Sequence, residues 1–163
     1  MSLYRARAVH LSLALLIVAI DRWTKRLAAA RIAMYAHIQI IPGFFRLTHT
    51  ENTGAAFSLF ADSSWHWKTM MLIAFSVLAM VIVIVLLWKQ ARLTTTGMAL
   101  SLILGGAAGN LWDRIVSGRV VDFLLLYVKQ YQWPVFNLAD SSIVVGASLL
   151  VIEILFARPH HPD

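Results

Sequence analysis

Two aspartates stand in strongly apolar surroundings. Asp122 is the only charge in the run "VVDFLLLYV", residues 120–128, and Asp140 stands at the mouth of the apolar segment "FNLADSSIVVGASLLVIEIL", residues 136–155. If the fold brings these carboxyls together, they cannot both ionise cheaply, so one keeps a proton while the other stays charged. Such a pair is a general base and a general acid in one unit. It can activate water against a peptide carbonyl and protonate the departing amine.

Each polar group also has a purely structural interpretation. Asp140 is equally suited to be the N-cap of a helix, since Asp and Ser favour that position. Asp21 and Lys25 are four residues apart and match a helical ion pair. Glu153 is best explained as snorkelling or paired, with a proton relay as the alternative. A further group matches a network at the end of a helix: Asn110, Asp113 and Arg114.

Other catalytic chemistries have no support in the sequence. There are no cysteines, which excludes disulfides, zinc-thiolate sites and a cysteine nucleophile. The six histidines show no H-E-x-x-H or other ligand spacing, so we expect no metal and no cofactor. No serine lies in a G-x-S-x-G context, which argues against a serine hydrolase.

The composition is that of a membrane protein. Of the 163 residues 60% are hydrophobic and 13% charged, whereas a soluble domain has about 25% charged residues. Mean hydropathy is +0.72. The net charge of +6 comes from basic residues that flank apolar runs instead of forming one stripe, which favours a membrane edge over nucleic acid. The length indicates one domain, residues 1–163.

Four apolar segments predict transmembrane helices, at approximately residues 9–28, 69–88, 97–115 and 140–157. The second is the clearest, with no charge between residues 70 and 88. The third is rich in small residues, and Gly105 and Gly109 form a G-x-x-x-G that allows close approach of another helix. The first run, residues 9–20, is too short to cross alone and must continue as a helix.

The order of these segments predicts that the polar residues converge. The first and third spans would run toward the same face, and the second and fourth would start from it. Polar groups at that depth usually point into the bundle and satisfy one another. The residues expected at this face are Asp21, Lys25, Asn52, Asn110, Asp113, Arg114, Asp122, Asn137 and Asp140.

The connections contain strands. "HIQIIPG" and "FFRLTHT" read as two short strands around Pro42 and Gly43, and "RVVDFLLLYV" as another. Apolar residues from Phe57 to Trp67 predict an interfacial segment on the bilayer. The predicted architecture is therefore membrane α-helical, with four transmembrane helices and a small antiparallel β-sheet and interfacial segment on one face.

The N-terminal segment has a competing interpretation as a cleaved signal peptide. Arg5 and Arg7 resemble an n-region, and the alanines at 28–30 resemble a cleavage site. Four charged residues between the apolar run and those alanines favour a retained first span. Both termini then lie on one side. The Lys and Arg count favours placing them outside, so charge alone leaves the orientation open.

Five ordered blocks resemble lipoprotein signal peptidase, also called signal peptidase II. They are "DRWTK" (21–25), "ENTGAAFS" (51–58), "GGAAGNLWDRI" (105–115), "GRVVDF" (118–123) and "FNLADSSI" (136–143). The resemblance extends over nearly the whole chain. It implies an intramembrane aspartic endopeptidase that removes the signal peptide of a prolipoprotein by cleaving just before a cysteine that carries diacylglycerol.

The resemblance also implies residue roles. Asp122 and Asp140 would be catalytic. The implied substrate-binding and supporting positions are Asn52, Gly54, Asn110, Asp113, Arg114, Asn137, Ala139, Asp21 and Lys25. Within this set we expect Asn52, Asn110 and Arg114 to orient the substrate backbone or the carboxylates. We expect the Asp21–Lys25 pair to support the active site structurally.

Localisation and partners follow from the same resemblance. It implies a multi-pass protein of the bacterial cytoplasmic (inner) membrane with cytoplasmic termini and its active site, sheet and interfacial segment at the outer, periplasmic face. The expected partners are diacylglyceryl prolipoprotein substrates, membrane lipid and globomycin-like cyclic peptide inhibitors. We expect a monomer with no cofactor, metal or nucleic acid.

Two other functions use the same residues. A small transporter or proton channel would use the carboxylates as a relay. A structural assembly protein would use the G-x-x-x-G as a partner interface.

Overall fold

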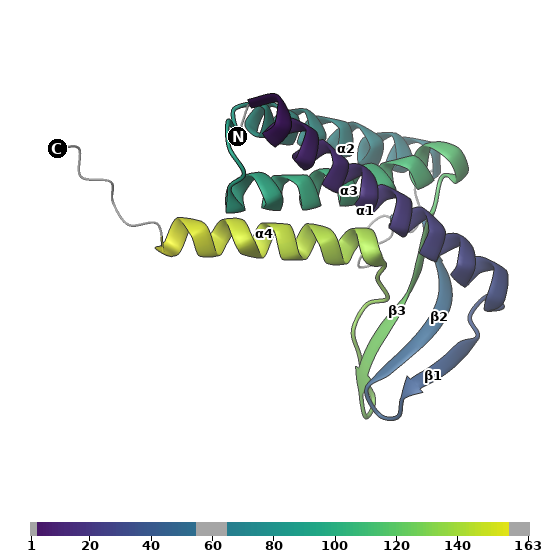
Figure 1. The fold of residues 1–163 in the computed structure, drawn as a ribbon. Helices are drawn as coiled ribbons and strands as arrows, with labels where there is room; N and C mark the ends of the chain where they lie inside the picture. The colour runs from purple at the N-terminus through teal and green to yellow at the C-terminus, as the bar shows by residue number, and fades with distance from the viewer. Residues whose placement is uncertain (1–2, 55–64, 157–163) are drawn as a thin grey trace.

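The computed structural model describes residues 3–54 and 65–156 (Figure 1). These residues form four helices, α1 (Leu3–Arg31), α2 (Trp65–Trp88), α3 (Thr95–Ser117) and α4 (Leu138–Phe156). They also form four strands, β1 (His37–Ile41), β2 (Phe45–Asn52), β3 (Val120–Val128) and β4 (Tyr131–Gln132). The helices pack side by side, and the sheet extends away from one end of the bundle. Residues 57–64 of the predicted interfacial segment lie outside the described residues.

Three of these helices are long and apolar enough to cross a membrane: α1, α2 and α4. Their outward side chains are apolar, as in Leu78 (57% exposed) and Ile154 (76% exposed), because lipid would be the solvent there. The membrane-type helical fold with a small sheet is therefore confirmed. The helix α3 has 23 residues but is not among the three, so the predicted count of four spans is not confirmed.

The small residues of α3 explain its lower apolar content, because α3 lies at the centre of the bundle. It contacts α1, α2 and α4. A Cβ added at Gly105 would lie 2.7 Å from the carbonyl oxygen of Ala14, and one at Gly106 would lie 2.4 Å from that of Ala139. The backbones of α1 and α4 therefore approach α3 at positions where no side chain fits.

The predicted G-x-x-x-G is a contact within this chain. Gly105 faces Ala14 and Ile17 of α1, and a Cβ at Gly109 would lie 2.6 Å from Oδ2 of Asp21. Both glycines are thus covered by α1. This removes the observation that supported an assembly protein, since the motif is not free to bind a partner.

The ends of α3 direct the chain into the sheet. Thr94 caps the N-terminus and accepts a hydrogen bond from the backbone N–H of Gly97. At the C-terminus Gly118 adopts φ 71°, and its N–H donates to the carbonyl oxygen of Arg114. This left-handed cap ends the helix and turns the chain into β3 within two residues.

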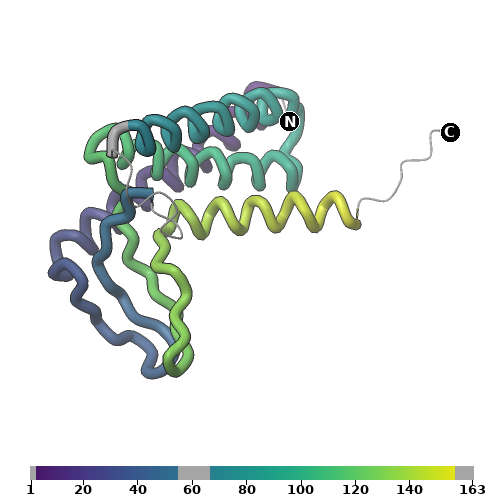
Figure 2. The backbone as a smooth tube through the Cα atoms, turned by 180° about the vertical axis from the view of Figure 1, so that it is seen from behind, coloured from purple at the N-terminus to yellow at the C-terminus, as the bar shows by residue number. Residues whose placement is uncertain are grey.

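The sheet is antiparallel with the order β1-β2-β3-β4. Strand β2 pairs with β3 so that Thr50 lies opposite Asp122 and Asn52 opposite Val120, after an irregularity between Leu47 and Thr50. Phe136, just before α4, adds an isolated bridge to Leu124. Both views show the start of α4 at the end of the bundle from which this sheet extends (Figure 2). The predicted strands are confirmed.

The helices differ from their predicted bounds mainly at α1. The helix extends beyond residues 9–28 at both ends and continues unbroken through the alanines at 28–30. It does so because its charged residues have partners inside the protein, as described below. The helix α4 begins two residues before the predicted boundary, at Leu138.

Replacing Gly146 by alanine should weaken the bundle. The added Cβ would lie 2.6 Å from the carbonyl oxygen of Ala99 and 2.8 Å from Cγ1 of Ile103, so α3 and α4 must separate. We expect a loss of about 1–3 kcal/mol, measured by thermal unfolding in detergent. Ala147→Val, which adds carbon at the exposed neighbouring position, should leave the unfolding temperature nearly unchanged. Equal stability of the two variants would contradict close packing.

Candidate active site

Asp122 lies on β3 with its side chain turned into the protein. It is 3% exposed, and Asn137 donates a hydrogen bond from Nδ2 to its Oδ1 at 2.7 Å. The side chain of Asn52, at the end of the neighbouring strand, also hydrogen-bonds to Asp122. The alternation of the strand gives Asp122 the same inward direction as the buried residue Val120 two positions before it.

Asp140 lies in the first turn of α4 and forms a reciprocal cap with Asn137. Its backbone N–H donates to Oδ1 of Asn137 at 2.9 Å, while the N–H of Asn137 donates to Oδ2 of Asp140 at 3.1 Å. This is a capping box, in which Asn137 is the N-cap and Asp140 is the third helical residue. The interpretation of Asp140 as the N-cap is therefore wrong. The helix N-terminus still stabilises its negative charge.

One asparagine therefore joins the two aspartates. Asn137 is 0% exposed and donates to Asp122 through its side chain and to Asp140 through its backbone. Asn110 of α3 holds the other oxygen of Asp140, donating from Nδ2 at 2.7 Å. The two carboxyl groups come from a strand and a helix whose backbones do not contact each other directly. Each nevertheless lies one hydrogen bond from Asn137.

Behind the aspartates, a buried lysine connects α1 to α3. Lys25 is 1% exposed, and its three N–H donors reach three acceptors. The distances from Nζ are 2.7 Å to Oδ2 of Asp21, 2.9 Å to Oδ2 of Asp113 and 2.9 Å to Oδ1 of Asn110. The predicted Asp21–Lys25 pair is confirmed, and Asp113 is part of the same network.

The network also holds the start of α4. The second oxygen of Asp21, Oδ1, accepts a hydrogen bond from the backbone N–H of Ala139 at 3.0 Å. Ala139 is fully buried, and its Cβ would lie 3.6 Å from a Cβ placed at Gly109. A larger residue at 139 would push α4 away from α3, which explains the small residue next to Asp140.

Sequence reasoning missed one member of this network. Arg22 forms an ion pair with Asp113 and lies over the ring of Trp112, 5.7 Å from its centroid. Its spacing of three residues from Lys25 was an available signal, since residues three apart share a face of a helix. With Arg22 included, two cations and two carboxylates balance one another.

Gly54 and Asn52 form a turn beside Asp122. The N–H of Gly54 donates to Oδ1 of Asn52 at 2.8 Å, which leaves the amide nitrogen of Asn52 for the carboxyl group. Gly54 has φ 87°, and a Cβ there would lie 2.1 Å from Cδ1 of Leu72. The positive φ favours glycine here, while the Leu72 side chain could move to admit a Cβ.

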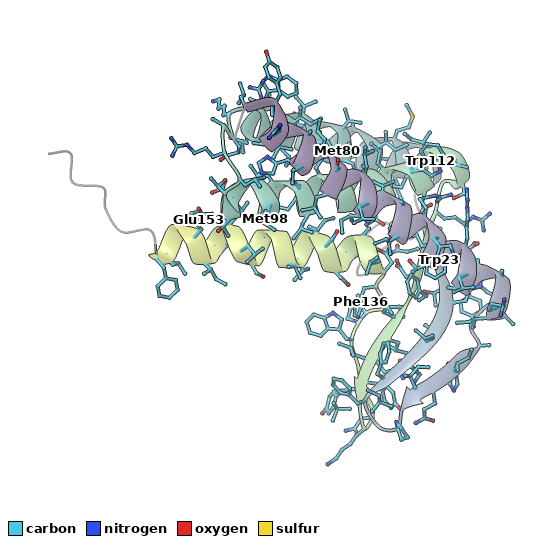
Figure 3. The ribbon with its side chains drawn as sticks, viewed as in Figure 1. Trp23, Met80, Met98, Trp112, Phe136 and Glu153 are labelled. Carbon is cyan, nitrogen blue, oxygen red and sulfur yellow. The ribbon has the colours of Figure 1, made fainter. Side chains whose placement is uncertain are left out.

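Arg114 faces the aspartates without an ion pair to a described residue. It is partly buried on α3 and close enough to interact electrostatically with Asp140 and Asp122. Every residue predicted for the site thus lies at or beside this cluster. Glu153 does not: it accepts a hydrogen bond from Thr96 at 2.7 Å and lies near the far end of α4 (Figure 3). The expectation that Glu153 is paired is confirmed.

The surroundings of Asp122 change its acidity. Burial, and next the charge of Asp140, raise the pKa of Asp122 from 3.8 to about 6. Hydrogen bonds from Asn137 and Asn52 and the charge of Lys25 act in the opposite direction. A carboxyl group with this pKa can hold a proton near neutral pH beside a charged partner, which is the condition for combined acid and base chemistry.

Comparison with known proteins places this geometry in a family. The family model described as signal peptidase (SPase) II matches residues 13–156, which is most of the chain. This chain belongs to the signal peptidase II family. The resemblance of its five sequence blocks is therefore confirmed. As a member, it is a membrane peptidase that removes signal peptides from prolipoproteins.

Individual relatives agree with this assignment. The lipoprotein signal peptidase of Solibacter usitatus is 46% identical over 143 residues, covering 87% of each chain. That of Francisella tularensis subsp. novicida is 38% identical, covering 97% of this chain and 98% of the relative. A solved bacterial membrane enzyme, determined by the in meso method at 1.9 Å resolution, superposes with a TM-score of 0.81. It is 29% identical and covers 93% of this chain and 95% of that one.

Removing the buried lysine should destabilise the signal peptidase strongly. Lys25→Met leaves Asp21 buried without its cation and Asp113 with only Arg22. Breaking a buried pair in this way costs about 3–5 kcal/mol, measurable by thermal unfolding in detergent.

Two further variants make this test specific. Asp21→Asn combined with Lys25→Met should recover part of the loss, because the uncompensated carboxylate is gone. Arg119→Met breaks the exposed pair with Glu51 and should cost less than about 1 kcal/mol. If Lys25→Met were no worse than Arg119→Met, the buried network would not be a main support of the fold.

Asp122 should make stability depend on pH. Its pKa is raised on folding, so the folded state binds the proton more tightly, and the free energy of unfolding falls as pH rises from about 4 to about 6. Asp122→Asn has no carboxyl group at this position, so this fall in the free energy of unfolding is absent. Its stability relative to the parent should therefore rise across that window by roughly 2–3 kcal/mol and stay constant above it.

Thermal unfolding of both proteins at about pH 4 and about pH 7.5 would measure the difference. Glu51→Gln removes a carboxylate from the neighbouring strand and controls for the loss of one acid. Parallel stability curves for Asp122→Asn and the parent would show that burial does not perturb this carboxyl group.

Proposed function

We propose that Asp122 and Asp140 are the catalytic pair of this signal peptidase and that it cleaves a diacylglyceryl prolipoprotein just before the lipid-modified cysteine. The observation that carries the proposal is Asn137, which donates to both carboxyl groups. It holds them as one unit at the junction of α4 and the sheet. This is the arrangement needed for one carboxyl to act as base while the other acts as acid.

The surroundings assign the two roles at the start of the reaction. Asp140 is the base, because the N-terminus of α4 and the donors from Asn137 and Asn110 stabilise its charge. Asp122, with its pKa raised to about 6, carries the proton. Asp140 takes a proton from water as the water oxygen attacks the scissile carbonyl carbon, and Asp122 gives its proton to the carbonyl oxygen. The C–N bond of the resulting diol then breaks: the amine nitrogen receives a proton from Asp140, and Asp122 takes back a proton from one hydroxyl as the new carboxyl group forms.

The depth of the pair suits a lipid-anchored substrate. Acyl chains in the bilayer hold the modified cysteine near the headgroups, so the carboxyl that activates water must lie at that level. Asp140 is in the first turn of an apolar helix, and Asp122 is on β3, which is bridged through Leu124 to Phe136 just before that helix. The pair therefore stands where the helical bundle ends and the sheet begins.

The surrounding residues position the pair and the substrate. Asn110 holds Asp140, and Asn52 with Gly54 holds Asp122. Arg114 faces both carboxyl groups and is placed to bind a substrate carbonyl. The residues that support the site from behind are Asp21, Lys25, Asp113 and Ala139.

The membrane arrangement is also part of the proposal. We assign α3 as a fourth span, since it lies between the three apolar helices and its 23 residues reach about 34 Å at 1.5 Å per residue. Following the family resemblance of the sequence blocks, we place the termini in the cytoplasm and the catalytic pair at the outer face of the inner membrane. The enzyme acts as a monomer, and globomycin-like cyclic peptides inhibit it by occupying the site.

Substituting either aspartate tests the catalytic assignment. Asp122→Asn and Asp140→Asn preserve shape but remove the acid or base, so each should lower turnover by at least about a thousandfold. The measurement is the gel shift of a purified diacylglyceryl prolipoprotein on cleavage. Unfolding temperatures of the variants would show that they remain folded.

Glu153→Gln is the matched control, because it removes a carboxylate of α4 at the other end of the helix. It should retain near-parent turnover. Near-normal cleavage by a folded Asp122→Asn or Asp140→Asn variant would refute the pair. Proton flux into liposomes that depends on the same aspartates would instead support a channel or transporter.

A further inference from the structure

A second charged feature lies on the far side of Lys25 and Asp113 from the catalytic pair. It is a cavity of about 200 Å³ between α1, the end of α3 and the start of β3. Four cationic side chains line it: Arg22, Lys25, Arg26 and Arg119. Two carboxylates, Glu51 and Asp113, also line it, so the lining carries an excess of positive charge. We call this the cationic cavity.

The arginines of the cationic cavity retain donors for a ligand. Lys25 has all three donors engaged inside the network. Arg22 uses one terminal nitrogen on Asp113, and Arg119 uses one on Glu51. Arg26 is exposed and makes no ion pair with a described residue. Because a guanidinium group has five N–H donors, the three arginines offer a cluster that matches a phosphate oxyanion.

An apolar cavity of about 290 Å³ lies along α1 and α3 on the N-terminal side of the cationic cavity. We call the two cavities together the groove. On α1 the apolar cavity's lining residues Leu11, Leu15 and Val18 continue at helical spacing into Arg22 and Arg26. They therefore form one stripe along the helix. The middle of the apolar stretch is between nine and ten residues from the middle of the charged one, roughly 14 Å along the axis.

On α3, as on α1, the residues that line the apolar cavity precede those that line the cationic cavity. The helices α1 and α3 are parallel, since Gly97 lies against His10 and Gly109 against Asp21. Leu104 of α3 lines the apolar cavity, and it precedes Asp113, which lines the cationic cavity, in the sequence. Met80 and Ile84 of α2 complete the apolar part.

Two exposed tryptophans indicate the depth of the groove in the membrane. Trp23 is 64% exposed and Trp112 is 53% exposed, and they adjoin Arg22 and Asp113 in sequence. Figure 3 shows both toward the end of the bundle that carries the sheet. Exposed tryptophans gather at the headgroup level of a bilayer. The cationic cavity thus lies at headgroup depth, and the apolar cavity lies in the hydrocarbon.

We propose that this groove binds an anionic phospholipid of the surrounding leaflet. Its phosphate lies among Arg22, Arg26 and Arg119, and one acyl chain lies in the apolar cavity between α1, α2 and α3. A bound lipid would tie α1 to α3 next to the ion pair of Arg22 with Asp113. It would therefore support the Lys25 network from the side opposite to the catalytic pair. The inference does not depend on the catalytic roles of the aspartates.

Lipid binding by the purified enzyme in neutral detergent tests the proposal. Native mass spectrometry would give the affinity for dioleoylphosphatidylglycerol, with dioleoylphosphatidylcholine and inorganic phosphate as competing probes. We expect the phosphatidylglycerol to bind selectively. Arg26→Gln should weaken it about fivefold, the factor for one cation at a membrane surface. Arg31→Gln, which removes an exposed cation five residues further along α1 and outside the cationic cavity, should change it less than twofold.

A second variant tests the apolar part. Ala108 lines the apolar cavity, so Ala108→Leu should weaken dioleoylphosphatidylglycerol but not a short-chain dihexanoyl analogue. Any of three results would overturn the proposal: equal affinity for phosphatidylcholine, equal thermal stabilisation by inorganic phosphate alone, or equal effects of Arg26→Gln and Arg31→Gln. Normal cleavage of substrate by Arg26→Gln in detergent would show that its fold is intact.

Discussion

A single buried ammonium group organises this protein. Lys25 is almost fully buried, and all three of its donors are engaged by acceptors on α1 and α3. A lysine at this depth is costly unless it is paired and hydrogen-bonded, so the acceptors have to be placed accurately. From this point one chain of contacts leads through Asn110 to Asp140. Another leads through Asp21 to the backbone of Ala139. The start of α4 is thus located by α1.

The same constraint explains the composition of α3. The polar network requires α1 and α4 to approach α3 closely, and glycine provides the space where their backbones meet it. The consequence is a central helix that is less apolar than its neighbours and is recognisable by its small residues. Most of the exposed apolar side chains of the bundle belong to the outer sides of the other three helices.

The end of the network that holds the proposed catalytic pair is kept at a cost. Asp122 is buried beside another carboxyl group, so its charged form is disfavoured and its pKa is raised. Stabilisation behind the site, from balanced ion pairs and a reciprocal helix cap, offsets this. Functional sites commonly hold groups that a purely stable fold would avoid. The lipid groove proposed between α1 and α3 would add support at the same level of the membrane.

Local pattern in the sequence was enough for the elements and for the list of polar residues. Apolar runs gave the helices, β-branched and aromatic runs gave the strands, and their order along the chain placed Asp21, Asn110, Asp122 and Asp140 at one end. These properties depend on spacing within about ten residues, which one sequence displays directly. The count of spans was harder, because the small residues of α3 serve packing and lower its apolar signal.

Tertiary structure alone decided which polar atoms meet. Spacing could not show that Asn137 is the cap and Asp140 its partner, since both residue types suit either position. Nor could it show that Arg22 joins Asp113 across two helices, or that Gly105 and Gly109 face α1 instead of another chain. Such pairings depend on the rotation and separation of helices distant in sequence. These are set by packing the whole bundle at once, and no local stretch of residues contains them.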